Sequence, residues 1–380
     1  MSELSIYEDI RPYRDHEFKK VMEKLLSSPL SDILISSVFP GIPVEKIKNQ
    51  LSSIETINEF QGKIIYSAIQ NVLTNTSAGL STSGLDNLIP GKPYLFISNH
   101  RDIILDPSLL NYVIYKQGLE TFEIAIGDNL MRTIWVRNLA RLNKSFVVKR
   151  NLPVRELIKT SKILSGYIYN TLIENHHSVW IAQREGRAKD GNDRTQPGVL
   201  NMIGLSSQGS LKDHFEQLNI LPVSISYEYD PCDTDKARSL YAQKFFGGYT
   251  KEKNEDNLAM KKGIAGYKGK IHIHFGTQLN DEIATLPDDL HKNELIQRIS
   301  NLLDKQIIGN YKLHKTNRIA YDILHDHNEN NEYYENEDRE KFIRDIEGKA
   351  ASMSGDKDEL AAIFLDMYAR PYANKTELFL

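Results

Sequence analysis

Residues 94–110, YLFISNHRDIILDPSLL, hold the change of pattern that decides the fold. The apolar run at 94–97 is typical of a buried strand, and four polar residues follow it directly at 99–102. Asp106-Pro107 then opens a stretch with apolar residues at helical spacing. A strand that passes through polar residues into a helix is the repeating unit of an α/β sheet.

Four more short apolar runs predict strands of the same sheet: SFVVK (145–149), SVWIA (178–182), ILPVSIS (220–226) and KIHIHFG (270–276). Amphipathic stretches such as VRELIKTSKILSGYIYNTLIE (154–174) separate them and predict helices. We therefore expect an α/β fold with a mixed, mostly parallel sheet flanked by helices, spanning residues 81–280.

Helical additions are predicted on both sides of this domain, at residues 1–80 and 281–380. Two apolar stripes near the N-terminus, one at 18–26 and one at 57–72, have helical spacing. Their interpretation stays open between packing on the main domain and lying on a membrane surface. The acidic stretch HDHNENNEYYENEDRE (325–340) is predicted to be a solvated linker or helix face.

Composition excludes several classes of protein. A formal charge of −4 argues against general nucleic-acid binding, which usually requires a basic excess. Cys232 is the single cysteine, so an intrachain disulfide and a multi-cysteine metal site are both excluded. The first residues lack the apolar core of a signal peptide, and no stretch approaches 18 uninterrupted apolar residues. We expect a cytoplasmic protein.

His100 is the candidate catalytic residue, because it follows a strand at the edge where open parallel sheets place their sites. The tripeptide His100-Arg101-Asp102 also occurs in protein kinases, but Pro107 stands where a kinase needs asparagine, and no Gly-rich phosphate loop precedes it. A neutral imidazole oriented by a carboxylate takes a proton from a substrate hydroxyl. This is the chemistry we expect of His100.

Three further predicted strands carry polar groups at their ends or a proline within them. The second predicted strand finishes in Lys149-Arg150, the third runs into QREGRAK with the turn Glu185-Gly186-Arg187, and the fourth contains Pro222. Together with the His100 segment, these blocks resemble the glycerolipid acyltransferases, the 1-acylglycerol-3-phosphate acyltransferases and their relatives. The resemblance covers roughly residues 85–280, and KIHIHFG is similar to the family's closing strand.

The resemblance implies a role for each matched residue. His100 would be the general base, which is typically worth about 10²–10⁴-fold in rate. Arg150 and the turn Glu185-Gly186-Arg187 would hold the acceptor's phosphate, together with Asn99 beside the histidine. No metal or redox cofactor is implied, because the acyl thioester of coenzyme A or acyl carrier protein is already activated.

The spacing departs from the family pattern at one point that matters. The family places four residues between histidine and aspartate, whereas five residues separate His100 from Asp106. Two carboxylates are therefore candidates for the partner of His100. Asp106 is favoured because it precedes a proline at the start of the helix, and its contact with His100 requires a non-helical loop. Asp102, two residues from His100, is the alternative.

The expected function is transfer of a fatty acyl group to a glycerol phosphate acceptor, foremost 1-acylglycerol 3-phosphate, which would give phosphatidic acid. Glycerol 3-phosphate is the second candidate acceptor, and a non-catalytic lipid- or protein-binding relative is the alternative from another class. Because such acceptors and acyl chains reside in membranes, we expect peripheral attachment to a membrane surface. His272 and His274 share a strand face, but no recognisable ligand set accompanies them.

Overall fold

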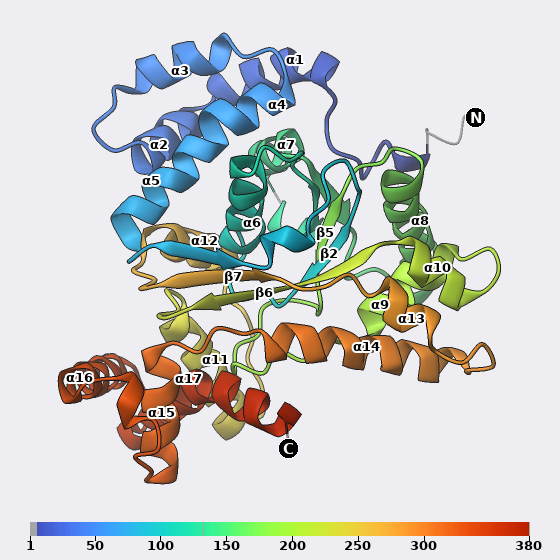
Figure 1. Ribbon diagram of the computed structural model, residues 1–380. Coiled ribbons are helices and arrows are strands. Elements are labelled where there is room, and N and C mark those ends of the chain that lie inside the picture. Colours follow the sequence, from blue (N-terminus) through green and yellow to red (C-terminus); the bar gives the residue numbers. More distant parts are fainter. Residues whose placement is uncertain (1–5, 132, 380) are drawn as a thin grey trace.

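A single mixed sheet organises the molecule. The computed structural model describes residues 6–131 and 133–379 (Figure 1). Within these residues the sheet has the strand order β1-β7-β6-β2-β5-β3-β4. Every neighbouring pair is parallel except β6 with β7, which is antiparallel. The strands are β1 (Leu80–Ser83), β2 (Leu95–Ser98), β3 (Glu123–Gly127), β4 (Ser145–Val148), β5 (Val179–Ala182), β6 (Ile220–Tyr227) and β7 (Ile271–Phe275).

The predicted fold class is confirmed, and the five predicted strands are β2, β4, β5, β6 and β7. Two strands escaped prediction. β1 is polar, and its side chains Ser81 and Ser83 bond to His272 and His274 on β7. β3 lies next to the edge strand β4, and only two of its five residues, Ile124 and Gly127, are buried.

Helices cover both faces of the sheet (Figure 1). Leu95 and Ile97 of β2 belong to a core shared with α8, α9 and α14, whereas Phe96 belongs to a core shared with α5 and α6. This alternation follows from the period of two in a strand. The helices of the first half are α1 (Asp15–Leu26), α2 (Pro29–Val38), α3 (Val44–Ser52), α4 (Ile57–Phe60), α5 (Tyr66–Thr76), α6 (Leu105–Lys116), α7 (Ile134–Leu142) and α8 (Val154–Ile173).

Those of the second half are α9 (Pro197–Ile203), α10 (Leu211–Gln217), α11 (Asp233–Phe246), α12 (Glu255–Ala265), α13 (Asn280–Ala284), α14 (Lys292–Gly309), α15 (Lys315–His325), α16 (Asn336–Ser352) and α17 (Lys357–Phe379). A π-helical segment, Gln61–Ile65, joins α4 to α5. Among the described residues, no helix combines the length and the apolar character that crossing a bilayer requires.

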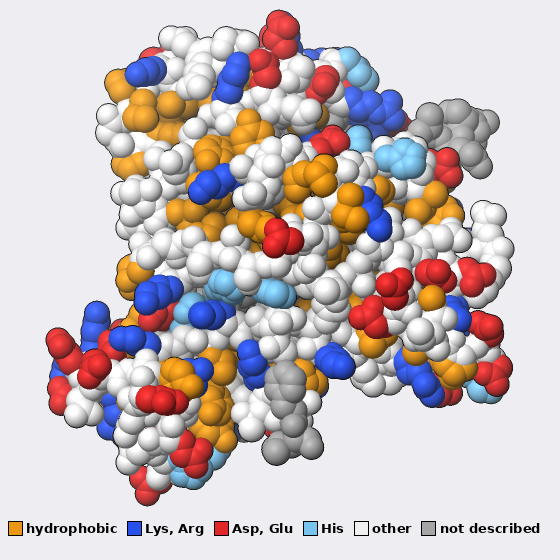
Figure 2. Space-filling view, viewed as in Figure 1, with side chains coloured by type: hydrophobic (Ala, Val, Ile, Leu, Met, Phe, Trp, Pro, Cys, Tyr) orange, Lys and Arg blue, Asp and Glu red, His pale blue; other side chains and the backbone are white. Residues whose placement is uncertain are grey.

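The N-terminal helices form their own core and pack on α7. Phe18 and Phe60 are fully buried there, with ring centroids 5.7 Å apart, and Leu142 of α7 joins the same cluster. The two apolar stripes therefore face protein, as the first of their two interpretations requires. Figure 2 shows that apolar side chains still reach the surface in the upper half of this view, where the N-terminal helices lie. Leu30 and Ile33 of α2 are among the exposed apolar residues.

The C-terminal helices form another core, from α15, α16 and α17, which Ala237 of α11 joins. The prediction of a solvated stretch at 325–340 was wrong in part. Tyr334 is buried in this core and donates a hydrogen bond to Asp322, and Asn330 is buried beside the same carboxylate. Acidic residues surround Tyr334 and Asn330 in the sequence, so the pattern did not indicate that these two residues are buried.

Phe18→Ala should lower the free energy of unfolding by about 3–5 kcal/mol, because it leaves a cavity in the core of the N-terminal helices. Ile33→Ala is the control, since a largely exposed side chain should change stability by less than about 0.5 kcal/mol. Urea unfolding followed by circular dichroism measures both values. Equal values for the two variants would contradict the packing described for α1 to α5.

Candidate active site

The site forms where the central strands end. β2 lies between β6 and β5 and runs parallel to both, so the carboxyl ends of the three strands meet at one edge. The chain leaves β2 through Asn99 and His100, and the backbone of this segment is held from β5. Gln183 N–H donates to the carbonyl of Ser98, and Ala188 N–H donates to the carbonyl of His100. The edge of the sheet thereby fixes the histidine's backbone.

His100 is paired with Asp106. The distance from His100 Nδ1 to Asp106 Oδ2 is 2.8 Å, and the carboxylate is fully buried. The imidazole ring also meets the Trp180 ring edge-on, with centroids 5.7 Å apart. Nε2 of His100 has no hydrogen-bond partner among the described residues, and His100 lines the large cavity of the molecule. An oriented imidazole with one free nitrogen facing a cavity is the arrangement of a general base.

A turn wound around the Asp106 carboxylate accommodates the extra residue between His100 and Asp106. Oδ2 also accepts hydrogen bonds from the backbone N–H groups of Arg101 (2.6 Å) and Asp102 (2.9 Å). Tyr227 at the end of β6 donates its hydroxyl to Oδ1 at 2.8 Å. Burial, and next the charge of Asp106, raise the pKa of the Tyr227 phenol well above its ordinary value, so the hydroxyl keeps its proton.

Asp102 has a different position from the one required of a partner to His100. Its Oδ1 accepts hydrogen bonds from the backbone N–H groups of Ile104 and Leu105, at 2.9 and 2.8 Å. Burial, and next the charge of Asp106, raise the pKa of this carboxyl. Asp102 therefore closes the turn before α6, and the geometry favours Asp106 as the carboxylate that orients the imidazole.

Asn99, for which the sequence predicts a contact with the acceptor, lies instead inside the protein. Its amide spans to β6, donating to the carbonyl of Ile225 at 2.8 Å and accepting from the N–H of Ile225 at 2.8 Å. It also donates to Asp193 at 3.2 Å. Since both ends of the amide are used and the side chain is fully buried, Asn99 joins the end of β2 to β6.

The other predicted acceptor-binding residues do line the cavity: Arg150, Glu185, Gly186 and Arg187. Arg150 follows β4, and its guanidinium lies 3.4 Å from the largely exposed carboxylate of Glu185. Gly186 has φ +71°, and a Cβ there would meet no atom within 4 Å. The left-handed backbone, not lack of space, therefore favours glycine in this turn.

Arg187 is the most suggestive of these residues, because Nη1 of its guanidinium is buried without a hydrogen-bond partner among the described residues. A buried N–H group without a partner is costly, and an anionic ligand in the cavity would supply one. Lys189 lines the same cavity, and burial together with the charge of Lys251 lowers the pKa of its ammonium. Arg184, Arg187 and Lys189 give this wall a local positive charge suited to phosphate.

The cavity has a volume of about 950 Å³ and two kinds of wall. His100 and the cations form one part of its lining. Another part is an apolar wall with residues from β3, β4, α8 and α9: Ile126, Val147, Ile163, Leu164, Val199 and Met202. A phosphate and a hydrocarbon chain could thus be held next to the same histidine.

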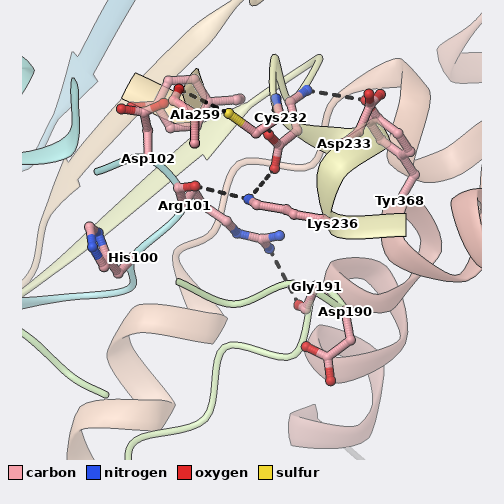
Figure 3. Close-up of polar contacts among 12 residues, drawn as sticks. His100, Arg101, Asp102, Asp190, Gly191, Cys232, Asp233, Lys236, Ala259 and Tyr368 are labelled. Carbon is pink, nitrogen blue, oxygen red and sulfur yellow. Dashed lines mark hydrogen bonds and ion pairs between the residues drawn. The ribbon is translucent and has the colours of Figure 1, made fainter. Parts of the chain in front are cut away.

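A buried network of charges lies behind the His100 turn (Figure 3). Arg101 donates to Asp193 at 2.6 Å and to the carbonyl of Gly191 at 3.3 Å. Lys236 of α11 donates to the carbonyl of Arg101 at 2.9 Å and is paired with Asp230. In Figure 3 the ring of His100 points away from these groups. The network therefore supports the turn without contacting the imidazole.

Two other candidates lie apart from the reacting edge. Cys232 is buried, donates to the carbonyl of Ala259, and burial raises the pKa of its thiol to about 12, which is unsuited to a nucleophile. His272 bonds through both ring nitrogens to Ser81 and Ser83, and burial lowers its pKa to about 4. Its hydrogen bonds join β7 to β1.

Sequence reasoning missed Tyr227, Trp180 and Lys189 as parts of the site. Tyr227 stands one residue beyond the predicted strand 220–226. Continuing the alternation of side-chain direction along that strand by one residue was the signal that could have indicated it. Trp180 is buried within β5, and its ring lies edge-to-face with that of His100. Lys189 follows the glycine turn closely, but its position in the cavity depends on the fold of the loop before α9.

Comparisons with known proteins bear on the family that the sequence blocks resemble. Residues 80–226 match the family model described as Acyltransferase. The matched segment begins at β1, ends within β6, and contains His100, Asp106, Arg150 and Arg187.

Curated relatives carry a consistent name. The chain is 25% identical over 232 residues to the glycerol-3-phosphate acyltransferase of Pseudoalteromonas translucida, an alignment covering 57% of this chain and 27% of that enzyme. It is 29% identical over 189 residues to the enzyme of the same name from Alteromonas mediterranea, covering 49% and 21%. With that of Pasteurella multocida, identity is 25% and coverage 67% and 32%. The alignments thus span about a fifth to a third of these enzymes.

Among solved structures, the 1-acyl-sn-glycerophosphate acyltransferase of Thermotoga maritima aligns with 10% sequence identity and a TM-score of 0.38, covering 76% of this chain and 92% of that one. The family model and the curated relatives bear out the resemblance stated from the sequence blocks. Residues 80–226 of this chain are therefore similar to the Acyltransferase family, and the chain is similar to curated glycerol-3-phosphate acyltransferases over part of their length.

Proposed function

We propose that this protein transfers a fatty acyl group from an acyl thioester to a hydroxyl of a glycerol phosphate acceptor. One observation supports this above the others. His100, whose Nε2 has no hydrogen-bond partner among the described residues, lines the same cavity as Arg187, whose buried Nη1 also has none. A non-catalytic lipid-binding relative would have no need of a histidine held by a buried carboxylate in that position.

The reaction would begin with proton transfer to His100. Nε2 takes the proton of the acceptor hydroxyl while Asp106 holds Nδ1–H and stabilises the imidazolium that forms. The hydroxyl oxygen attacks the thioester carbonyl, and the C–S bond breaks as the intermediate collapses. The imidazolium then returns its proton to the departing thiolate, which leaves as a thiol. Atoms and charge balance without a further reactant.

The cations would select the acceptor. Arg187 and Arg150, with Lys189 close by, bind the phosphate at a fixed distance from His100, so the hydroxyl approaches Nε2. The apolar wall along α8 receives the acyl chain of the donor. Coenzyme A and acyl carrier protein are both compatible donors, since each presents the same thioester.

Glycerol 3-phosphate is the acceptor we propose, because the curated relatives are named glycerol-3-phosphate acyltransferases. 1-Acylglycerol 3-phosphate is the second candidate, and the long apolar wall of the cavity favours it over other phosphorylated alcohols. Both reside in or react at membranes, so peripheral attachment to a membrane surface is part of the proposal.

The test is a panel of acceptors. Purified protein is incubated with palmitoyl-CoA and glycerol 3-phosphate, 1-acylglycerol 3-phosphate, glycerol or monoacylglycerol, and the products are identified by mass spectrometry. Acylation of glycerol 3-phosphate supports the proposal, and acylation of only 1-acylglycerol 3-phosphate selects the second candidate. Transfer to unphosphorylated acceptors at equal rates would contradict the role of the cations.

His100→Ala should lower kcat by about 10²–10⁴-fold, the size of a general-base contribution. Asp106→Asn should be nearly as harmful, because it removes the charge that stabilises the imidazolium, and the double variant should be little worse than either. Steady-state kinetics with saturating donor measures these values.

Asp102→Asn is the matched control. The amide keeps an oxygen that can accept from Ile104 and Leu105, so the turn should persist and kcat should change by less than about fivefold. If Asp102→Asn abolishes activity while Asp106→Asn does not, the proposed pairing is wrong.

Arg187→Ala should raise KM for the phosphorylated acceptor by at least about tenfold, the effect of losing a charge-assisted hydrogen bond, and change KM for acyl-CoA much less. Arg187→Lys should restore only part of the loss, because the ammonium lacks the planar bidentate geometry. Equal increases in both KM values would mean that Arg187 does not read the acceptor.

A further inference from the structure

The first two turns of α8 are exposed to solvent. All residues from 153 to 159 are exposed, whereas Leu164 and Ile168 farther along the same helix are buried. Val154 is 74% exposed and Ile158 is 59% exposed, which is unusual for aliphatic side chains. At 100° per residue these two, Leu164 and Ile168 lie on one face of the helix. The apolar face of α8 thus continues from the core into solvent.

Cations flank the exposed part of this face. Arg155, Lys159 and Lys162 lie on the neighbouring side of the helix, and none forms an ion pair with any residue that the structure describes. Lys149, just before the helix, has one long ion pair: its Nζ lies 3.8 Å from the carboxylate of Asp9, which is largely exposed. Exposed aliphatic residues bordered by unpaired Lys and Arg are the composition of a surface that enters the interface of an anionic membrane.

These exposed turns border the cavity. Leu157 lines the cavity and is 40% exposed, and Lys149, Arg150 and Leu164 line it as well. α7 starts at the same edge of the sheet, because β3 and β4 are parallel neighbours and α7 and α8 follow them. Ile134, its first residue, is 75% exposed and has exposed Arg137 beside it.

We propose that the N-terminal turns of α8, defined by Val154, Arg155, Ile158 and Lys159, with Ile134 of α7, dock on the surface of an anionic phospholipid bilayer. The proposal rests on the proposed function, since it supplies the route by which a lipid-borne chain reaches His100. The apolar face of α8 leads from this surface toward the cavity, whose lining includes Leu157 and Leu164 of the same helix.

A bilayer fits this surface better than a protein partner does. Lysine is depleted in the cores of protein interfaces, whereas here basic residues alternate with the exposed aliphatic ones. Exposed Lys and Arg each add to the attraction of an anionic surface, and the aliphatic side chains reach below the headgroups. This also places the membrane contact away from the stripes of α1 and α5, which are buried.

The experiment measures binding to vesicles without substrate. Wild-type protein and Val154→Asp/Ile158→Asp are sedimented with vesicles of equimolar phosphatidylglycerol and phosphatidylcholine, and with vesicles of phosphatidylcholine alone. Wild type should bind the anionic vesicles more strongly, and the variant should lose at least about tenfold in partition coefficient. Arg155→Glu/Lys159→Glu should remove the preference for anionic vesicles.

The matched control is Leu30→Asp/Ile33→Asp on α2, which changes two aliphatic residues that are also exposed. It should bind vesicles as wild type does. Loss of binding in this control with none in the α8 variant would overturn the proposal, as would undiminished binding in both. Self-association of the wild type in sedimentation velocity that the α8 variant abolishes, with vesicle binding unchanged, would assign the surface to a second copy and also overturn it.

Acyl transfer from a short-chain acyl-CoA to glycerol 3-phosphate in solution separates this proposal from the proposed function. Neither Val154 nor Ile158 lines the cavity, so the α8 variant should keep the rate of the wild type there. Absence of transfer by the wild type contradicts the proposed function but leaves the vesicle result intact. Circular dichroism of each variant checks that it is folded.

Discussion

The Asp106 carboxylate is the point on which the arrangement of the site depends. It accepts four hydrogen bonds, from His100, from the backbone of Arg101 and Asp102, and from Tyr227. A fully buried carboxylate is costly unless its oxygens are bonded, and these groups satisfy it. The same bonds bend the chain so that the end of β2, the turn and the start of α6 have one geometry. The hydrogen bonds that satisfy this buried carboxylate therefore also orient the imidazole.

Much of the fold could be predicted because the strands of a covered sheet are short apolar runs, and five of them stood out in the sequence. β1 could not be recognised, since its serines are stabilised by His272 and His274 nearly 200 residues later. The pairing of His100 with Asp106 followed from context in spite of the unusual spacing. The turn that makes it possible is stabilised by Tyr227, a partner more than 120 residues away.

The position of the Asn99 side chain could not be predicted from its neighbours in the sequence. A polar residue beside the candidate catalytic histidine suggests a substrate contact, yet the amide of Asn99 joins β2 to β6. In the interior each amide donor and acceptor needs a partner, and the backbone of a neighbouring strand supplied both. Arg150 and Arg187 both line the cavity, because they follow parallel strands that end at the same edge of the sheet. Their role toward the phosphate of the acceptor stays a prediction.

The support of the His100 turn reaches the end of the chain. Lys236 holds the carbonyl of Arg101, and Tyr368 of α17 donates to Asp233 and accepts from the N–H of Asp230, which bracket the start of α11. Removing one partner from such a buried set leaves an uncompensated charge, at a cost of about 3–5 kcal/mol. The turn that holds His100 and the last helix are consequently linked by one set of buried polar contacts. Opening of α17 would expose the amide protons of the turn to exchange with solvent, although the two segments lie more than 250 residues apart in the chain.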